Sequence, residues 1–207
     1  MCTRYYIASD NSEISEIIEK ARSSALIERF LDQYGKAFVS EGEVRPTDLV
    51  AVIAMNQKGE KSAFPMKWGY SLPNSKTPVV NARSETASEK PLFREDWKKH
   101  RCIIPASYYF EWEHLKTADG KTKTGDKYLF QPAGESTTWL CGLYHLENAL
   151  PVFTILTKEP SAELARFHDR MPVILPEEMI EQWISPQTAP EDIMQYAINS
   201  VLYSRDK

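Results

Sequence analysis

The order of strand-like and helix-like segments most limits how this chain can fold. Segments rich in apolar and β-branched residues fill the middle of the sequence, and helix-like segments lie mainly towards its two ends. Strand and helix do not alternate in the regular way that builds a doubly wound parallel sheet. We therefore predict an α+β fold, with a single domain over residues 1–207 in which helices flank a mainly antiparallel, barrel-like sheet.

The strand predictions rest on apolar and β-branched runs bounded by turn-forming residues. The clearest is a hairpin in which residues 49–55 and 62–68 flank the turn sequence Asn56-Gln57-Lys58-Gly59. A polar loop is expected at 118–126. The other predicted strands cover 4–8, 102–112, 127–131, 138–144 and 152–157.

Helices are predicted where apolar residues recur at intervals of three and four. From Ser12 to Tyr34 this spacing fits one long helix or two shorter ones, and we favour two that join near Ser23 and Ser24. The remaining predicted helices cover 89–100, 161–168, 177–184 and 191–199.

The overall charge does not identify the protein as a nucleic-acid binder. The formal net charge is -4, whereas nucleic-acid-binding domains are typically basic. A local basic groove is still compatible with this value, because phosphate binding depends on where Lys and Arg lie. Function must therefore be sought in particular residues.

Membrane spans, secretion signals and metal sites are not indicated. No run approaches ~18 continuous apolar residues, and Met1-Cys2-Thr3-Arg4 lacks the apolar core of a signal peptide. The cysteines at positions 2, 102 and 141 give neither a disulfide framework nor a zinc-binding spacing. We predict a monomer without metal or cofactor in the cytoplasm, either free in a bacterial cytoplasm or associated with the nucleoid.

Cys2 has the most informative chemistry. A small second residue permits removal of Met1, after which Cys2 carries an amine and a thiol on neighbouring atoms. Both groups reach their nucleophilic forms near neutral pH, since their ordinary pKa values are ~8 and ~8.5. An aldehyde can condense with the amine to a Schiff base, and the thiolate can then close a thiazolidine ring. The alternative is that Cys2 is only a small buried apolar residue.

Two further segments combine polar groups with an apolar or aromatic setting. Asn81 and Arg83 are expected to share a strand face, where they could hold a sugar oxygen and a phosphate; an ordinary turn-and-cap cluster explains them equally well. Glu111 lies among four aromatic residues, so its pKa should rise if it is buried and it could then transfer protons. A solvent-facing position is the alternative for Glu111.

His168 and Arg170 lie where a predicted helix gives way to a strand. A histidine there can donate and accept protons near neutral pH, and Arg170 could bind a phosphate. A single histidine is more often structural, and His100, His114 and His145 have no neighbourhood that points to a function.

Seven segments together resemble the SRAP family, the SOS-response-associated peptidases, in the family's order along nearly the whole chain. They are Met1-Cys2, Arg45-Pro46-Thr47, Trp68-Gly69, 81–86, 101–106, Glu111-Trp112 and 168–173. The resemblance implies a single α+β domain that forms a thiazolidine crosslink with an abasic site in single-stranded DNA once Met1 is removed. The name peptidase fits removal of Met1 by the protein itself, but a cellular aminopeptidase could perform the same step.

The resemblance also implies roles for individual residues. Cys2 would be the nucleophile, and Glu111 would assist crosslinking and its reversal; a lyase activity is a further expectation. Asn81 and His168 would position the sugar aldehyde and move protons. The residues that would contact DNA phosphates or a stacked base are Arg4, Trp68, Arg83 and Arg170.

The chain departs from the family pattern at two positions beside this set. Thr3 and Tyr108 stand where the family usually carries glycine. Because glycine permits close backbone approach and positive φ, these two side chains could narrow the DNA groove.

Two other functions compete with this interpretation. An N-terminal-nucleophile amidohydrolase of the glutamine amidotransferase type would also expose Cys2 and use its own amine as the base. A non-catalytic single-stranded DNA-binding module would use its aromatic side chains to stack on bases and would not need Cys2.

Overall fold

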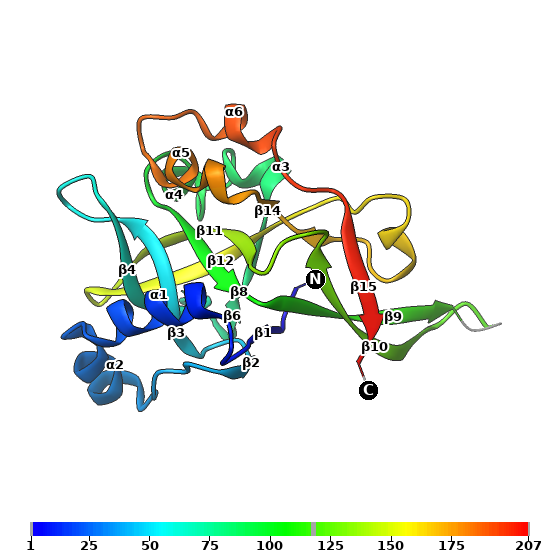
Figure 1. Cartoon of the computed structure of the whole chain (residues 1–207), viewed down its shortest axis with the longest axis horizontal. Helices are drawn as coiled ribbons and strands as arrows, with labels where there is room; N and C mark the ends of the chain where they lie inside the picture. The colour runs from blue at the N-terminus through cyan, green and yellow to red at the C-terminus, as the bar shows by residue number, and fades with distance from the viewer. Residues whose placement is uncertain (1, 117–118, 207) are drawn as a thin grey trace.

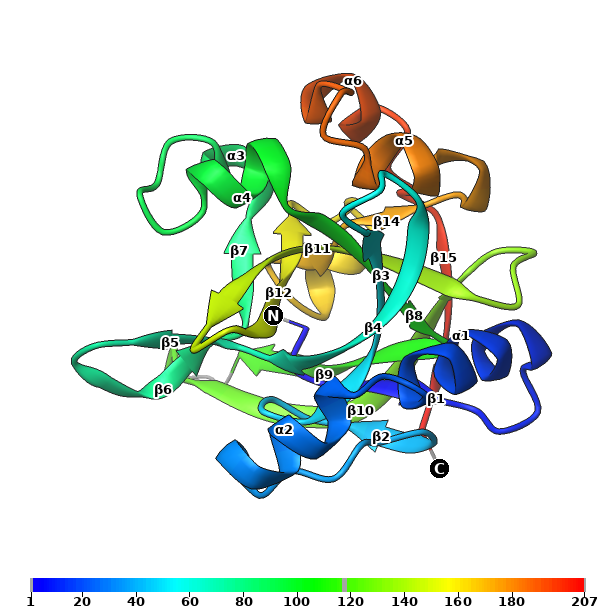
Figure 2. The ribbon, with the colours of Figure 1, turned by 90° about the vertical axis from the view of Figure 1, so that its left-hand side faces the viewer.

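The centre of the computed structural model, which describes residues 2–116 and 119–206, is a closed ring of strands (Figure 1, Figure 2). In spatial order the ring contains β12 (Leu150–Lys158), β4 (Lys61–Trp68), β3 (Leu49–Met55), β8 (Arg101–Ala106) and β11 (Thr138–Glu147). Pairing of β11 with β12 closes the ring, and β4 with β12 is its one parallel neighbour pair within the described chain. The predicted α+β fold with a mainly antiparallel, barrel-like sheet is confirmed.

A second, antiparallel sheet packs against the barrel and carries the N-terminal strand. Its strands in spatial order are β15 (Val201–Arg205), β10 (Thr122–Pro132), β9 (Tyr108–Lys116), β1 (Tyr5–Ile7) and β2 (Gly42–Val44). Tyr5 from this sheet and Trp68 from the barrel share one hydrophobic cluster, with their rings 5.5 Å apart. The start of the chain is thereby held between the two sheets (Figure 1).

Short strands complete the sheets around β12 and β11. β7 (Asn81–Arg83) runs parallel to β12, β13 (Met171–Pro172) pairs with β12, and β14 (Ile174–Leu175) pairs with β11. β5 (Tyr70–Leu72) and β6 (Ser75–Val79) form a separate hairpin.

The helices lie on the outside of the strands. They are α1 (Ser12–Arg22), α2 (Leu26–Tyr34), α3 (Ser84–Ala87), α4 (Arg94–Lys99), α5 (Ile180–Ile184) and α6 (Pro190–Met194), with 3-10 turns η1 (Leu164–Arg166) and η2 (Glu177–Met179). The two predicted N-terminal helices are confirmed. Asn11 caps the first by accepting a hydrogen bond from the Ile14 N–H at 3.1 Å. None of the helices in the described part of the chain is long and apolar enough to cross a membrane.

Three of the predicted helices are shorter than expected. The helix predicted at 89–100 begins only at Arg94, because Pro91 lies in the turn before it. The one predicted at 161–168 is a single 3-10 turn, and the one predicted at 191–199 ends at Met194.

The predicted strand at 102–112 is wrong, because it is two strands in different sheets. The chain bends at Ser107, whose N–H donates to the Tyr6 carbonyl at 2.8 Å and whose hydroxyl accepts from the Ala8 N–H at 2.9 Å. The polar groups of Ser107 are therefore paired with the β1 segment, and the strand that ends at Ala106 does not continue through Ser107 in the same sheet. The predicted loop at 118–126 is also partly wrong: position 118 lies outside the described residues, and β10 already begins at Thr122.

Gly142 gives a test of how tightly the barrel is packed. It pairs with Cys102 on β8 and Ile155 on β12, and an added Cβ would lie 2.7 Å from Ile104 Cδ1 and 2.8 Å from the Thr154 carbonyl oxygen. We expect Gly142→Ala to lower the free energy of unfolding by about 1–3 kcal/mol in chemical denaturation, as overpacked cores do. Ser136→Ala, at an exposed turn, is the control. An unchanged stability of Gly142→Ala would show that the barrel wall yields at this point.

Candidate active site around Cys2

Cys2 is held in place by backbone and side-chain hydrogen bonds from two directions. The Arg4 carbonyl accepts from the Phe110 N–H at 3.0 Å as the chain enters β1, and the Asn81 amide Nδ2 donates to the Cys2 carbonyl at 2.9 Å. The thiol is fully buried, with Sγ 3.8 Å from the Arg4 carbonyl oxygen. Met1, whose removal is predicted, lies outside the described residues. The second residue is therefore a fixed part of the core rather than a loose end.

Asn81 connects Cys2 to the barrel. It opens β7 directly opposite Ile155 of β12, so the strand pairing sets the position of its side chain. One end of the amide holds the Cys2 carbonyl, while Oδ1 is buried and accepts no hydrogen bond from a described residue. A buried amide oxygen is costly to leave unsatisfied, so Asn81 offers an acceptor directly beside Cys2.

Glu111 supplies a buried carboxyl group to the same region. It lies in β9 opposite Tyr128 of β10, and only 6% of it is exposed. Burial raises the pKa of Glu111 to about 7, so it can be either protonated or ionised near neutral pH. The pKa of the Cys2 thiol is raised by burial and, secondarily, by the charge of Glu111. The carboxyl and the thiol therefore influence each other's protonation.

His168 follows η1 and is held by the turn after it. Its Nδ1 accepts from the Arg170 N–H at 3.0 Å and lies 2.6 Å from Oδ1 of Asp169. The first contact requires an unprotonated Nδ1 and the second favours a protonated one. Burial lowers the pKa of His168 to about 4, and the Asp169 carboxylate is largely exposed and can turn to solvent. At pH 7 the ring is therefore neutral, with its proton on Nε2.

Two residues predicted to contact DNA are buried instead. Trp68 is fully buried, donates from Nε1 to the Val80 carbonyl at 2.9 Å and stacks on Phe153. Arg170 is 7% exposed and donates both to Glu85 and to the Thr157 carbonyl, each at 2.7 Å. In this structure both side chains are buried and bonded to other parts of the protein, so their contact with DNA stays a prediction.

The other two predicted DNA contacts lie nearer the surface. Arg83 is exposed at the end of β7 and forms no ion pair with a residue in the described part of the chain. Arg4 is partly exposed, and its Nε lies 3.1 Å from Oε1 of Glu43. Arg83 is therefore the more available cation for a phosphate.

Of the two departures from the family pattern, Tyr108 lies away from the site. It pairs with Tyr6, and the two rings stack with centroids 5.0 Å apart. Because side chains alternate along a strand, this ring is on the face of the sheet opposite Glu111. Thr3 is partly buried beside Cys2, and its carbonyl accepts from Arg4 at 2.7 Å.

The sequence analysis missed the structural role of Glu85. This carboxylate holds the Arg170 guanidinium and accepts from the Glu159 N–H at 3.2 Å, so it fixes the turn that contains His168. Glu85 and Arg170 are 85 positions apart. No local spacing could have connected them.

Comparisons with known proteins agree with one another. The family model described as SOS response associated peptidase (SRAP) matches residues 1–204. The chain is 34% identical to the Abasic site processing protein YobE of Bacillus subtilis (strain 168), over 94% of this chain and 87% of that protein. It is 32% identical to the Abasic site processing protein YoqW of the same organism, over 94% of this chain and 85% of that protein. A crystal structure of a protein from Bacteroides thetaiotaomicron has a TM-score of 0.73 at 20% identity, covering 100% of this chain and 92% of that one; it shares the fold.

The protonation of His168 can be measured directly. We expect nitrogen-15 NMR of the ring to show a neutral imidazole with its proton on Nε2 at pH 7, titrating near pH 4 because burial opposes the charged form. In Asp169→Asn the same tautomer should persist, since the Arg170 N–H sets it. A proton on Nδ1 at pH 7 in the wild type would overturn this assignment.

The buried Glu111 should make stability depend on pH. The pKa of its carboxyl is about 7 in the folded protein against an ordinary 4.5, so the folded protein holds a proton that the unfolded chain releases between these values. Stability is therefore lost as pH rises from 4.5 to 7. Glu111→Gln should match the wild type below pH 4.5 and exceed it by about 3 kcal/mol above pH 7.

Chemical denaturation at several pH values measures this difference. The exposed Glu89→Gln is the matched control and should not show the same pH dependence. Equal stability of Glu111→Gln and the wild type at pH 8 would mean that the carboxyl is not held in a low-dielectric environment.

Proposed function

The chain belongs to the SOS response associated peptidase (SRAP) family, and we propose that it processes abasic sites in DNA by bonding Cys2 covalently to the sugar aldehyde. The proposed substrate is an abasic site in single-stranded DNA, and the proposed product is a thiazolidine crosslink. The observation that carries the proposal is the position of Cys2: it is buried, its carbonyl accepts a hydrogen bond from the Asn81 amide, and its thiol feels the charge of Glu111, a carboxyl whose pKa is about 7.

Removal of Met1 is the first step of the proposal, either by the chain itself or by an aminopeptidase. It converts the Cys2 amide nitrogen into an amine, the group that attacks an aldehyde. The new α-ammonium also places a positive charge beside the thiol. That charge favours the thiolate and offsets the effect of burial on the thiol pKa.

Ring formation then needs two bonds to the same carbon. The amine attacks the aldehyde carbon to give a carbinolamine, which loses water to form an imine. The Cys2 sulfur attacks the imine carbon, and the imine nitrogen takes up a proton, so one water is released overall. Glu111 can protonate the departing hydroxyl and then accept the thiol proton, because its pKa of about 7 makes both forms accessible. Opening of the ring by the reverse steps returns the free aldehyde. The proposed lyase activity would instead start from the imine, which loses a proton from the sugar C2′ and expels the 3′-phosphate by β-elimination.

Asn81 and His168 are the proposed positioning groups for the sugar. The buried Asn81 Oδ1 can accept a hydrogen bond from the Cys2 amine or a sugar hydroxyl. The neutral His168 ring can donate from Nε2 to a sugar oxygen. Arg83 is the proposed phosphate contact. Arg4 is a weaker candidate, because the Glu43 carboxylate partly neutralises its charge.

The test is to mix the purified protein with single-stranded DNA that contains one abasic site. We expect a heat-stable adduct on denaturing gels, with the mass of the protein lacking Met1 plus the DNA less one water. Cys2→Ala should form none. Cys2→Ser is a second control of similar size. Once Met1 is removed both variants keep the α-amine without the thiol, so both should give an imine that persists only after borohydride reduction. Glu111→Gln and His168→Ala should slow crosslinking by about 10- to 100-fold.

The competing functions predict different results. A glutamine-type amidohydrolase would release ammonia from glutamine and form no adduct. For a non-catalytic module, the wild type and the Cys2→Ala variant would bind the DNA with equal affinity and neither would form an adduct. Absence of an adduct from wild-type protein with confirmed loss of Met1 would reject the crosslinking proposal.

A further inference from the structure

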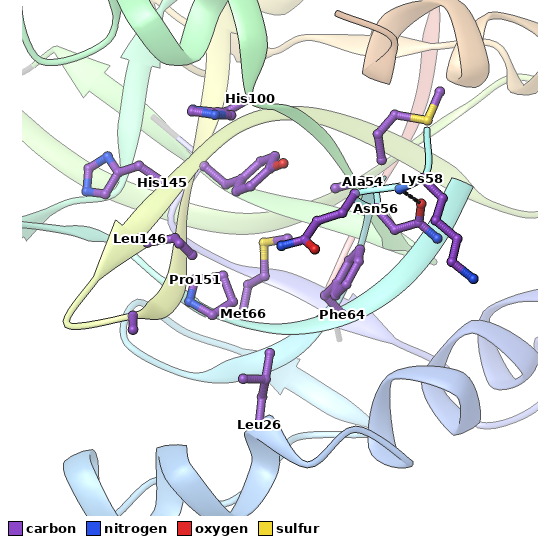
Figure 3. Close-up of a pocket in the computed structure, with 14 residues that line it drawn as sticks. Leu26, Ala54, Asn56, Lys58, Phe64, Met66, His100, His145, Leu146 and Pro151 are labelled. Carbon is purple, nitrogen blue, oxygen red and sulfur yellow. Dashed lines mark hydrogen bonds between the residues drawn. The ribbon is translucent and has the colours of Figure 1, made fainter. Parts of the chain in front are cut away.

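A cavity of about 790 Å³ opens in the barrel wall away from the proposed crosslinking site (Figure 3). β4 pairs with β12 only through Lys67 and Trp68, so the first part of β4 diverges from the β11–β12 hairpin. The cavity lies in that opening. None of the residues proposed for the Cys2 site lines it. The volume is in the range of ligand pockets, about 300–1,000 Å³.

The floor of the cavity is the apolar interior of the barrel. Ala54 and Met66 belong to the hydrophobic cluster inside the barrel, and Phe64 packs against that cluster. Leu26 from α2 and Pro151 from β12 form further apolar wall; in Figure 3 Pro151 lies next to Met66, and Leu26 lies below them. An apolar body of a ligand would be well accommodated here because it would cover side chains that otherwise face water.

The polar residues that line the cavity lie at its edge, and those among them that can be charged near neutral pH are all basic. Among the described residues that line the cavity, none is acidic, whereas Lys58, His100 and His145 can each be cationic. Both histidines are committed to Asp96, a buried carboxylate behind the wall, through Nδ1 at 2.9 and 3.1 Å. Lys58 forms no ion pair with any residue in the described part of the chain. It is therefore the uncompensated charge of the cavity edge.

Lys58 is also held at a defined place. Its backbone N–H donates to the Asn56 Oδ1 at 2.8 Å, drawn as the dashed line in Figure 3, and the Glu60 N–H donates to the same oxygen at 3.0 Å. The Asn56 amide in turn donates to Glu60 and Ser62 at 3.0 and 3.1 Å. The β3–β4 turn is thus fixed, and it places the backbone of Lys58 at the cavity edge, from which the exposed side chain extends.

We propose that this cavity is a second binding site, for a small molecule with an apolar body and one anionic head group. The apolar body would lie over Phe64 and Met66, and the head group would lie at the Lys58 ammonium. Charge complementarity favours the anion, because none of the described lining residues is acidic, and a neutral ligand would leave Lys58 unpaired; the nearby carboxylates Asp96 and Glu147 are already bonded to His145. The site is independent of the crosslinking chemistry at Cys2.

Octanoate and octan-1-ol are matched probes, because they share the chain and differ in the charge of the head group. We expect octanoate to bind the full chain with one-to-one stoichiometry in calorimetry and to shift the methyl NMR signals of Met66 and Leu26. Octan-1-ol should bind about fivefold more weakly, as an exposed ion pair contributes little more than that. Lys58→Gln should reduce octanoate binding to the level of the alcohol, and Lys90→Gln, at an exposed position elsewhere, should leave it unchanged.

Leu26→Trp should weaken both probes alike, since it fills the cavity from α2 (Figure 3). The wild-type NMR map decides the result even if that variant folds poorly. Saturable shifts confined to the cavity together with the preference for octanoate would establish the site. Absence of shifts at Met66 and Leu26 up to millimolar probe, or equal affinity for acid and alcohol, would overturn the proposal.

Discussion

The pairing of β1 with β9 fixes the segment that carries Cys2. Tyr5 lies opposite Tyr109, and the hydrogen bond from the Phe110 N–H to the Arg4 carbonyl leaves only Thr3 between Cys2 and the paired backbone. A chain terminus normally frays, because few contacts offset its conformational entropy. Here a central strand holds it, and the Asn81 amide takes the Cys2 carbonyl. The fold thereby holds Cys2 in a fixed position, although a residue so near a chain terminus is normally mobile.

The same burial that fixes Cys2 sets the protonation of its neighbours. Desolvation raises the pKa of the Cys2 thiol and of Glu111 and lowers that of His168. All three shifts favour the neutral form, so Cys2 and Glu111 tend to keep their protons while His168 is left able to accept one. An α-ammonium formed at Cys2 would add a positive charge beside the thiol. The loss of one residue at the terminus would therefore alter both the nucleophile and the groups that serve it.

The sequence was sufficient where the information is local. The hairpin around Asn56 to Gly59 and the two N-terminal helices follow from turn residues, caps and apolar spacing, and all are present. It was insufficient where a partner far along the chain decides the outcome. β1 bends the chain at Ser107, and Glu85 buries Arg170, so neither the strand break nor the role of that arginine could be inferred from neighbouring residues.

The distribution of cations bears on how such a protein would hold DNA. Arg170 is bonded to Glu85, and Glu43 lies against Arg4, Arg45 and Lys127. Few basic groups near Cys2 are thus left for phosphates, in keeping with a net charge of -4. Phosphate contacts set both the affinity of an encounter and its sensitivity to salt. On the proposed mechanism the encounter would be weak and only mildly salt-dependent, and the lifetime of the complex would come from the covalent ring rather than from the charges around it.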